Sequence, residues 1–162
     1  MKKTVIFAVL TFCCMVLIFC FSAQDASESD KTSDSFTVKV LSTVSSKFND
    51  LDEEKQAEVV DSLAFPVRKA AHFSIYFVLG IFSVLTFISV KRIKFYYNSL
   101  FAFLLCALYS VSDEIHQYFV KGRRCEIRDM LIDSGAALLA VIIVTAVIKI
   151  EREKNYAKEK AS

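Results

Sequence analysis

Ionisable and amide side chains are concentrated next to the ends of apolar segments of this sequence. In RKAAHFSIY, residues 68–76, Arg68, His72 and Tyr76 recur every four positions, so they share one face of a predicted helix, with Lys69 beside them. Guanidinium and imidazole groups on one face can hold an anion and move a proton. The alternative is that basic residues at the end of a span only extend their charged groups toward water. We interpret Lys69 in this second way.

A second polar group is SDEIHQ, residues 112–117. Asp113, His116 and Gln117 share a helix face, and Glu114 lies on the flank toward Gln117. A carboxylate one turn from an imidazole can orient the ring and raise its basicity, as a general base or proton relay requires. The density of polar groups favours a functional site over simple solvation of a helix end.

The third group begins in the loop KGRRCEIRD, residues 121–129. Arg123 and Arg128 can bind phosphate or carboxylate with two-pronged guanidinium groups, or neutralise nearby acidic residues. Asp129 and Asp133 follow one turn apart on the same helix face, and Gly135 is expected to allow close helix approach.

Charges near a membrane boundary are costly unless they are paired or hydrated, so we expect these groups to meet. The predicted cluster contains Arg68, His72, Asp113, His116, Arg123 and Asp129. Metal binding is a competing interpretation, because His, Asp and Glu are all ligand types. The chain has only two histidines, without a compact two-histidine spacing, so the sequence predicts no metal and no cofactor.

Four apolar segments must position these residues: 5–22, 73–90, 95–111 and 130–148. Each has roughly the 17–25 residues that cross a hydrocarbon core of ~30 Å. A cleaved signal peptide is the alternative for the first segment, but its apolar part is longer than a signal core, so an uncleaved span is favoured. The predicted fold is an all-α membrane protein with four transmembrane helices.

The segment between the first two spans is predicted to lie outside the bilayer. Residues 23–35 are rich in Ser and Asp and indicate a flexible linker, whereas Phe36, Val40 and Val44 begin an amphipathic helical pattern. These helices are expected to rest on lipid headgroups, or else to form a lid over the polar site. Pro66 suits the first turn of the second span. The predicted divisions are 1–22, 23–65, 66–148 and 149–162.

Basic residues predict the orientation. The cytoplasmic side of the cell membrane would carry both termini and most of the basic segments: Lys2, Lys3, the turn residues Lys91, Arg92 and Lys94, and the tail 149–162. The net charge of +2 and the absence of a basic cluster interleaved with aromatic residues argue against nucleic acid as a partner. Membrane lipids are the expected partners. The cysteines indicate no disulfide framework.

The chain resembles the VanZ-like family of bacterial membrane proteins. The resemblance is carried by FSAQ after the first span, RKAAHFSIYFVLG, YSVSDEIHQYFVKGRRCEIRDMLIDSGAALL and the four-span layout. It implies a polytopic envelope protein, and a named member confers low-level resistance to the glycopeptide teicoplanin. By motif, it marks as important Ser22, Gln24, Arg68, Lys69, His72, Tyr76, Asp113, Glu114, Gln117, Gly122, Arg123, Asp129, Asp133 and Gly135. The chain departs from the family pattern at Ala23, Lys121 and Arg124.

The sequence therefore predicts an outward-facing polar site that engages a lipid-linked or peptidoglycan-related anion. Arg68, Arg123 and Arg128 would hold the anion, His72 or His116 would move protons, and Asp113, Asp129 and Asp133 would orient them. Catalysis stays open beside binding. The alternatives are an accessory protein whose charges form a structural network and, ranked last, a small transporter, because the fourth span has almost no polar residues beyond Asp133.

Overall fold

A computed structural model describes residues 2–90 and 94–161, so Lys91 and Arg92 of the predicted basic turn lie outside it. In this part of the chain the order is α1 (Lys2–Ser22), α2 (Ala26–Val44), α3 (Ser46–Asn49), α4 (Glu53–Ile88), α5 (Phe95–Tyr118) and α6 (Ile127–Ala161). Four of these helices, α1, α4, α5 and α6, are long and apolar enough to cross a membrane. The predicted all-α, four-span fold is confirmed.

Helix α4 lies at the centre of the bundle and packs against α1, α5 and α6. The closest approach is at Gly80, where an added Cβ would lie 2.7 Å from the carbonyl oxygen of Ala137 and 3.0 Å from the Ala140 Cβ. Small residues therefore bring α4 and α6 together, as in many membrane bundles. Gly135, from which the sequence predicted this contact, is exposed, and none of the described residues comes within 4 Å of an added Cβ. That prediction was wrong.

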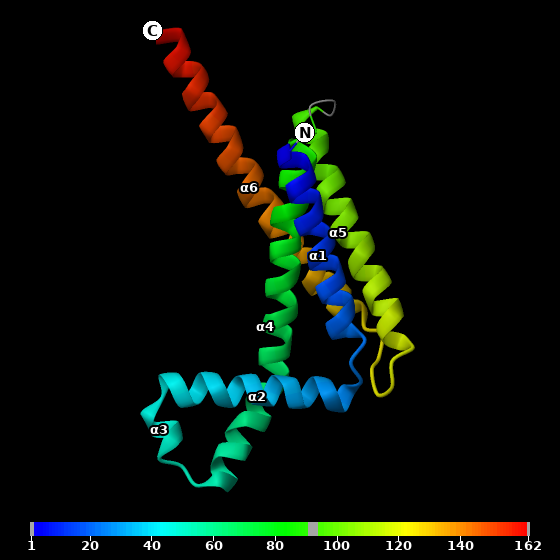
Figure 1. Ribbon diagram of the computed structural model, residues 1–162, viewed down its shortest axis with the longest axis vertical. Helices are drawn as coiled ribbons and strands as arrows, with labels where there is room; N and C mark the ends of the chain where they lie inside the picture. Colours follow the sequence, from blue (N-terminus) through cyan, green and yellow to red (C-terminus); the bar gives the residue numbers. More distant parts are fainter. Residues whose placement is uncertain (1, 91–93, 162) are drawn as a thin grey trace.

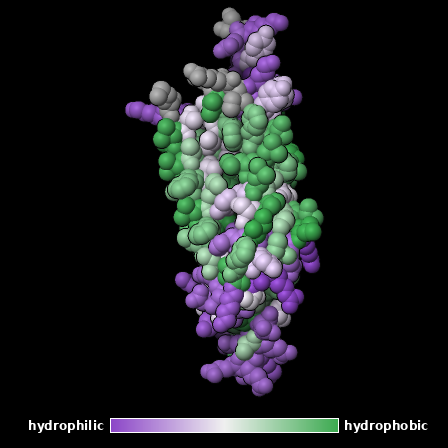
Figure 2. All heavy atoms as spheres, turned by 90° about the vertical axis from the view of Figure 1, so that its right-hand side faces the viewer, coloured by the Kyte–Doolittle hydropathy of each residue, from purple (hydrophilic) through white to green (hydrophobic). Residues whose placement is uncertain are grey.

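The surface of the bundle is apolar over its middle, and Figure 2 shows this band between two hydrophilic ends. Large side chains such as Phe12, Leu108 and Ile142 are more than half exposed there. A soluble protein would bury such a surface, whereas lipid solvates it. The chain is a multi-pass membrane protein.

Helix α2 lies across one end of the bundle, which we call the α2 end (Figure 1). Asp25 caps α2 by accepting a hydrogen bond from the Glu28 backbone N–H at 2.9 Å, and the Thr32 hydroxyl donates back to the Glu28 carbonyl. These local bonds make residues 26–35 helical, so the prediction of a flexible linker was wrong there. Ser29 and Thr37 face the protein, while Val40 and Val44 are exposed.

Helix α4 runs without interruption through Pro66, which the sequence placed in the first turn of a span. The helix instead starts at Glu53, capped by Asp52, whose side chain accepts from the Lys55 backbone N–H. The part of α4 beyond its crossing with α2 leans away from the axis of the rest (Figure 1), as a missing N–H and a bulky ring at Pro66 would cause.

At the opposite end of the bundle, α6 continues past the other helices as an exposed helical tail (Figure 1). Its 35 residues give a length of about 50 Å, more than a hydrocarbon core requires. The basic side chains of the tail therefore lie beyond the apolar band.

Candidate functional site

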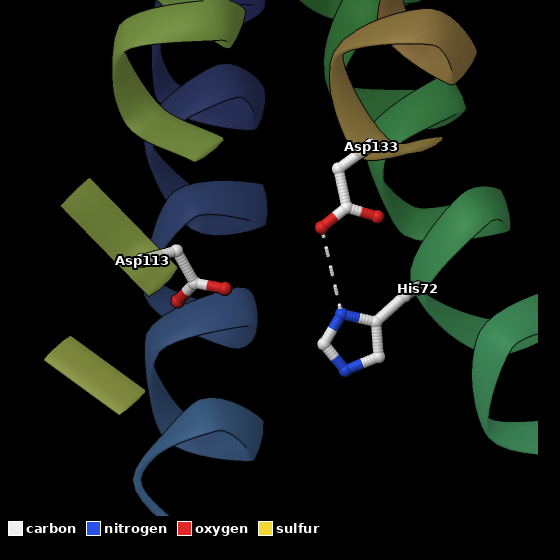
Figure 3. A group of neighbouring side chains, drawn as sticks. All are labelled: His72, Asp113 and Asp133. Atoms are coloured by element: carbon white, nitrogen blue, oxygen red, sulfur yellow. Dashed lines mark ion pairs between the residues drawn. The ribbon is translucent and has the colours of Figure 1, made fainter. Parts of the chain in front are cut away.

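Three side chains from three helices converge near the α2 end. His72 comes from α4, Asp113 from α5 and Asp133 from α6, and one ligand-type atom of each lies within 4.8 Å of the others. His72 Nδ1 is 3.8 Å from Asp133 Oδ2, and the Asp113 carboxylate faces this pair across the gap (Figure 3). Asp113 and Asp133 are nearly fully buried. These three residues, which we call the floor triad, have the donor types that hold a divalent metal.

The end of α1 holds Asp113 in place. The Ser22 hydroxyl donates to Asp113 Oδ2 at 2.9 Å, and the Gln117 Nε2 amide donates to the same oxygen at 3.1 Å. Tyr76, fully buried one turn from His72, places its hydroxyl beside Asp113 and Asp133. These contacts fix the carboxylate from two sides.

Glu114 anchors the loop that precedes α6. Its side chain is 1% exposed, and Oε2 accepts the Glu126 backbone N–H at 3.0 Å. The loop turns at Gly122, whose φ of +77° suits glycine and whose absent Cβ would lie 3.0 Å from the Ala26 Cβ. The loop therefore packs closely on the start of α2.

Arg123 ties the same loop to α1. Its guanidinium donates to the Gln24 carbonyl at 3.0 Å, to Gln117 Oε1 at 3.1 Å and to the Phe21 carbonyl at 3.3 Å. Burial, together with the nearby Arg68, lowers the pKa of Arg123 from its usual value, although an arginine stays charged. Because its guanidinium donates three hydrogen bonds within the protein, the main role of Arg123 is to hold the loop in place.

Two further ion pairs surround the triad. Arg68 pairs with Asp30 of α2, and Lys69 pairs with Asp129 of α6. The Lys69 ammonium also lies 5.2 Å from the centre of the Phe65 ring. Arg68 Nε is buried without a hydrogen-bond partner among the described residues, so the guanidinium keeps a free donor.

A polar cavity of about 370 Å³ opens above the floor triad. His72 and Asp133 line its deep end, and Arg68, Lys69, Arg123 and Arg124 place basic groups around it. A second, largely apolar groove of about 420 Å³ runs between α1, α2 and α4. Arg68, His72 and Arg123 line both, so the two spaces adjoin.

A comparison with protein-family models decides the family. The model described as VanZ/LLP1 matches residues 7–149, which include the floor triad and the lining of the polar cavity. The chain belongs to the VanZ/LLP1 family. No curated protein and no solved structure matches the chain significantly.

Most of the residues predicted to form the site of this VanZ/LLP1 protein do come together. Those that line the polar cavity are Arg68, Lys69, His72, Gln117, Arg123, Asp129 and Asp133. Asp113, Glu114 and Tyr76 lie directly behind it through the contacts given above. The roles assigned to these side chains stay predictions.

Two predicted residues lie elsewhere. The His116 ring stacks on Phe19 of α1, with the ring centroids 4.5 Å apart, and does not line the polar cavity. Among the described residues Asp113 accepts from Ser22 and Gln117, so no bond supports the predicted pairing of Asp113 with His116. Arg128 is exposed and lines neither space. His116 was expected in the cluster and Arg128 among the residues that hold the anion, because the sequence does not show which helix surface faces the neighbouring helices.

Sequence reasoning missed Asp30 and Glu126. Asp30 pairs with Arg68 only because residues 26–35 are helical, and the Asp25 to Glu28 spacing of a helix cap was the available signal. Glu126 contributes its backbone N–H, for which a sequence carries no signal.

Proposed function

We propose that this VanZ/LLP1 protein binds an anionic, lipid-linked or peptidoglycan-related ligand of the bacterial envelope at the α2 end. In this proposal the α2 end faces outward and both termini lie in the cytoplasm. The orientation agrees with the excess of basic residues at the opposite end, namely Lys2, Lys3, Lys94 and those of the α6 tail, because basic residues are enriched on the cytoplasmic side of membrane proteins. The biological outcome would be envelope modification or tolerance to glycopeptides of the teicoplanin type, the role that the sequence resemblance implies.

The observation that carries the proposal is that a polar cavity with basic lining adjoins an apolar groove. An amphiphile with an anionic headgroup needs both environments side by side, because its charge and its hydrocarbon chain are solvated by different surroundings. Arg68, His72 and Arg123 lie at the junction, so one ligand can occupy both spaces.

Arg68 is the best candidate for the headgroup contact. It has an unused buried Nε donor, and its partner Asp30 is half exposed, so a phosphate or carboxylate can compete for the guanidinium. Arg124 at the exposed rim adds a second positive charge. Arg123 contributes mainly by holding the loop.

The structural-network alternative rests on the pairs that the charges already form, Lys69 with Asp129 and Arg68 with Asp30. It accounts for those pairs but not for the adjoining groove. Transport ranks last, because the helices toward the opposite end carry hydroxyl pairs such as Thr11 with Thr86 rather than a continuing line of ionisable groups.

Ligand retention by the purified protein tests the proposal. Native mass spectrometry would compare four probes: undecaprenyl phosphate, phosphatidylglycerol, phosphatidylcholine and inorganic phosphate. We expect the two anionic lipids to bind and the other two to bind at least tenfold more weakly, since the lipids alone match both the charge and the groove. Arg68→Gln should weaken anionic-lipid binding about tenfold, the effect of losing one charge-assisted contact.

Arg128→Gln is the matched control, because it removes the same charge at an exposed position outside both spaces. Equal loss in both variants, or equal retention of anionic and zwitterionic lipids, would contradict the proposal. Binding of inorganic phosphate alone would assign the cavity to a soluble anion instead. In a teicoplanin-sensitive host, Arg68→Gln should lower tolerance relative to Arg128→Gln at equal abundance in the membrane.

A further inference from the structure

The floor triad has a spacing that hydrogen bonding does not explain. The 3.8 Å between His72 Nδ1 and Asp133 Oδ2 is too long for a hydrogen bond. Two ligands of one divalent ion, each about 2.0–2.2 Å from the metal, lie roughly 3–3.6 Å apart. The His72–Asp133 pair is therefore slightly wider than in a loaded site, and the ligand-type atoms of the three residues lie within 4.8 Å of one another, so the side chains must move closer together to hold an ion.

Two buried polar atoms at the triad have no partner among the described residues. Asp133 Oδ2 is one, in a residue that is 2% exposed, and it faces His72. The hydroxyl of Tyr76, a residue with no exposed surface, is the other by strict distance and angle, but it interacts with the Asp113 carboxylate, so Asp133 Oδ2 is the clearer of the two. An unpaired buried polar group costs about 1–3 kcal/mol, so these atoms indicate a missing partner.

Charge balance indicates that this partner is a cation. Four carboxylates surround the deep end of the cavity: Asp113, Glu114, Asp129 and Asp133. Lys69 and Arg123 oppose them, whereas Arg68 pairs with Asp30, and Arg124 and Glu126 at the exposed rim offset each other. With the four carboxylates ionised and His72 neutral, two negative charges remain among these buried groups, and a divalent ion would neutralise them.

We propose that His72, Asp113 and Asp133 bind one divalent cation of the Mn²⁺ or Zn²⁺ class. One imidazole nitrogen with two carboxylates suits these ions better than Mg²⁺ or Ca²⁺, which prefer oxygen alone. Ser22 and Gln117 donate hydrogen bonds to Asp113 Oδ2 and so orient its carboxylate, as residues around a metal site commonly orient the ligands. His72 and Asp133 also line the polar cavity, so the ion keeps open positions toward it.

The cation site does not depend on the proposed anionic ligand, although an ion at the cavity floor would attract one. The two proposals can be tested separately, because Arg68 lines the cavity but is not one of the three ligand residues. Arg68→Gln should leave cation affinity within about threefold of the wild type.

Titration of the purified, chelator-stripped protein with Mn²⁺ and with Zn²⁺ tests the site. We expect one equivalent of ion to bind by calorimetry and to raise the melting temperature. Asp133→Asn and His72→Asn should each weaken binding at least tenfold. His116→Asn is the matched control, since it replaces the other histidine of the chain outside the cavity and should bind like the wild type.

A spectroscopic readout covers the case in which a triad variant fails to fold. Pulsed electron paramagnetic resonance of Mn²⁺ bound to the His116→Asn protein should show nitrogen coupling, which only His72 can then supply. No ion binding by the wild type, equal binding by His72→Asn and His116→Asn, or bound Mn²⁺ without nitrogen coupling in His116→Asn would each overturn the proposal.

Discussion

The two halves of this bundle are held together by different kinds of contact. Toward the opposite end from α2, the helices meet through small and apolar residues, among them Gly80, Ala137 and Val84, and through hydroxyl pairs. At the α2 end, charged, amide and hydroxyl groups from α1, α2, α4, α5 and α6 contact one another around a cavity. Close packing needs no charge, so the α2 end carries a polar cost that packing alone does not require.

The buried carboxylates mark the α2 end as the region of the bundle where a functional site is expected. Burying Asp113, Glu114 and Asp133 in one region is destabilising unless partners satisfy them. Ser22, Gln117 and the Glu126 N–H supply some of those partners, and Asp133, whose Oδ2 has no partner among the described residues, lines the cavity.

The two ends should differ completely in access from outside the cell. Cys125 is exposed in the loop at the α2 end, so a membrane-impermeant thiol reagent should label it in intact cells. Cys125→Ser is the control for background from Cys13 and Cys20, which are also exposed. Lys94→Cys in that background should be labelled only after the cells are opened. Labelling of position 94 in intact cells would reverse the orientation and place the cavity inside.

Gly80→Ala and Gly135→Ala should have opposite effects on stability. The new Cβ at position 80 would lie 2.7 Å from a backbone oxygen of α6, so the helices must separate at a cost of about 3 kcal/mol. At position 135 nothing lies within 4 Å, and alanine in place of glycine should gain up to ~1 kcal/mol. Unfolding by SDS in mixed micelles measures both. Equal stability of the two variants would contradict the packing described for α4 and α6.

Glu114→Ala should lower the free energy of unfolding by about 2 kcal/mol, because the Glu126 N–H loses its buried acceptor and Gln117 loses a neighbour. Glu126→Ala removes an exposed side chain but keeps that N–H, so it should change stability by less than about 0.5 kcal/mol. Glu114→Gln retains an acceptor and should recover most of the loss. All three variants would be measured in the same SDS titration, and a larger effect at position 126 would contradict the anchoring role of Glu114.

The sequence predicted the four spans and the meeting of His72 with Asp113 because these features follow from apolar length and from positions along each helix. It did not predict which way each helix turns. Residues three apart on a helix point about 60° apart, so Asp113 can point toward His72 and Asp133 while His116 stacks on Phe19. The rotation of each helix about its own axis also determines that Gly80, and not Gly135, lies between two helices.

The error at residues 26–35 has a different physical origin. A segment rich in Ser and Asp has little apolar periodicity, and composition alone indicates a loop. Its helicity depends on the Asp25 cap, on Ser and Thr hydroxyls that bond to carbonyls one turn earlier, and on the contact of Asp30 with Arg68. The last of these joins positions 38 residues apart, which no local pattern encodes.

The smallest effect is expected at a hydroxyl pair of the apolar half. Ser99 Oγ and Thr145 Oγ1 lie 2.8 Å apart between α5 and α6. Such interhelical bonds contribute about 0.6 kcal/mol on average, because a separated hydroxyl finds other partners in its own helix. Ser99→Ala and Thr145→Val should each cost less than about 1 kcal/mol, and the double variant should cost about 0.6 kcal/mol less than the sum. A coupling above about 2 kcal/mol would mean that polar contacts also hold the apolar half together, and the contrast with the α2 end would then be one of charge alone.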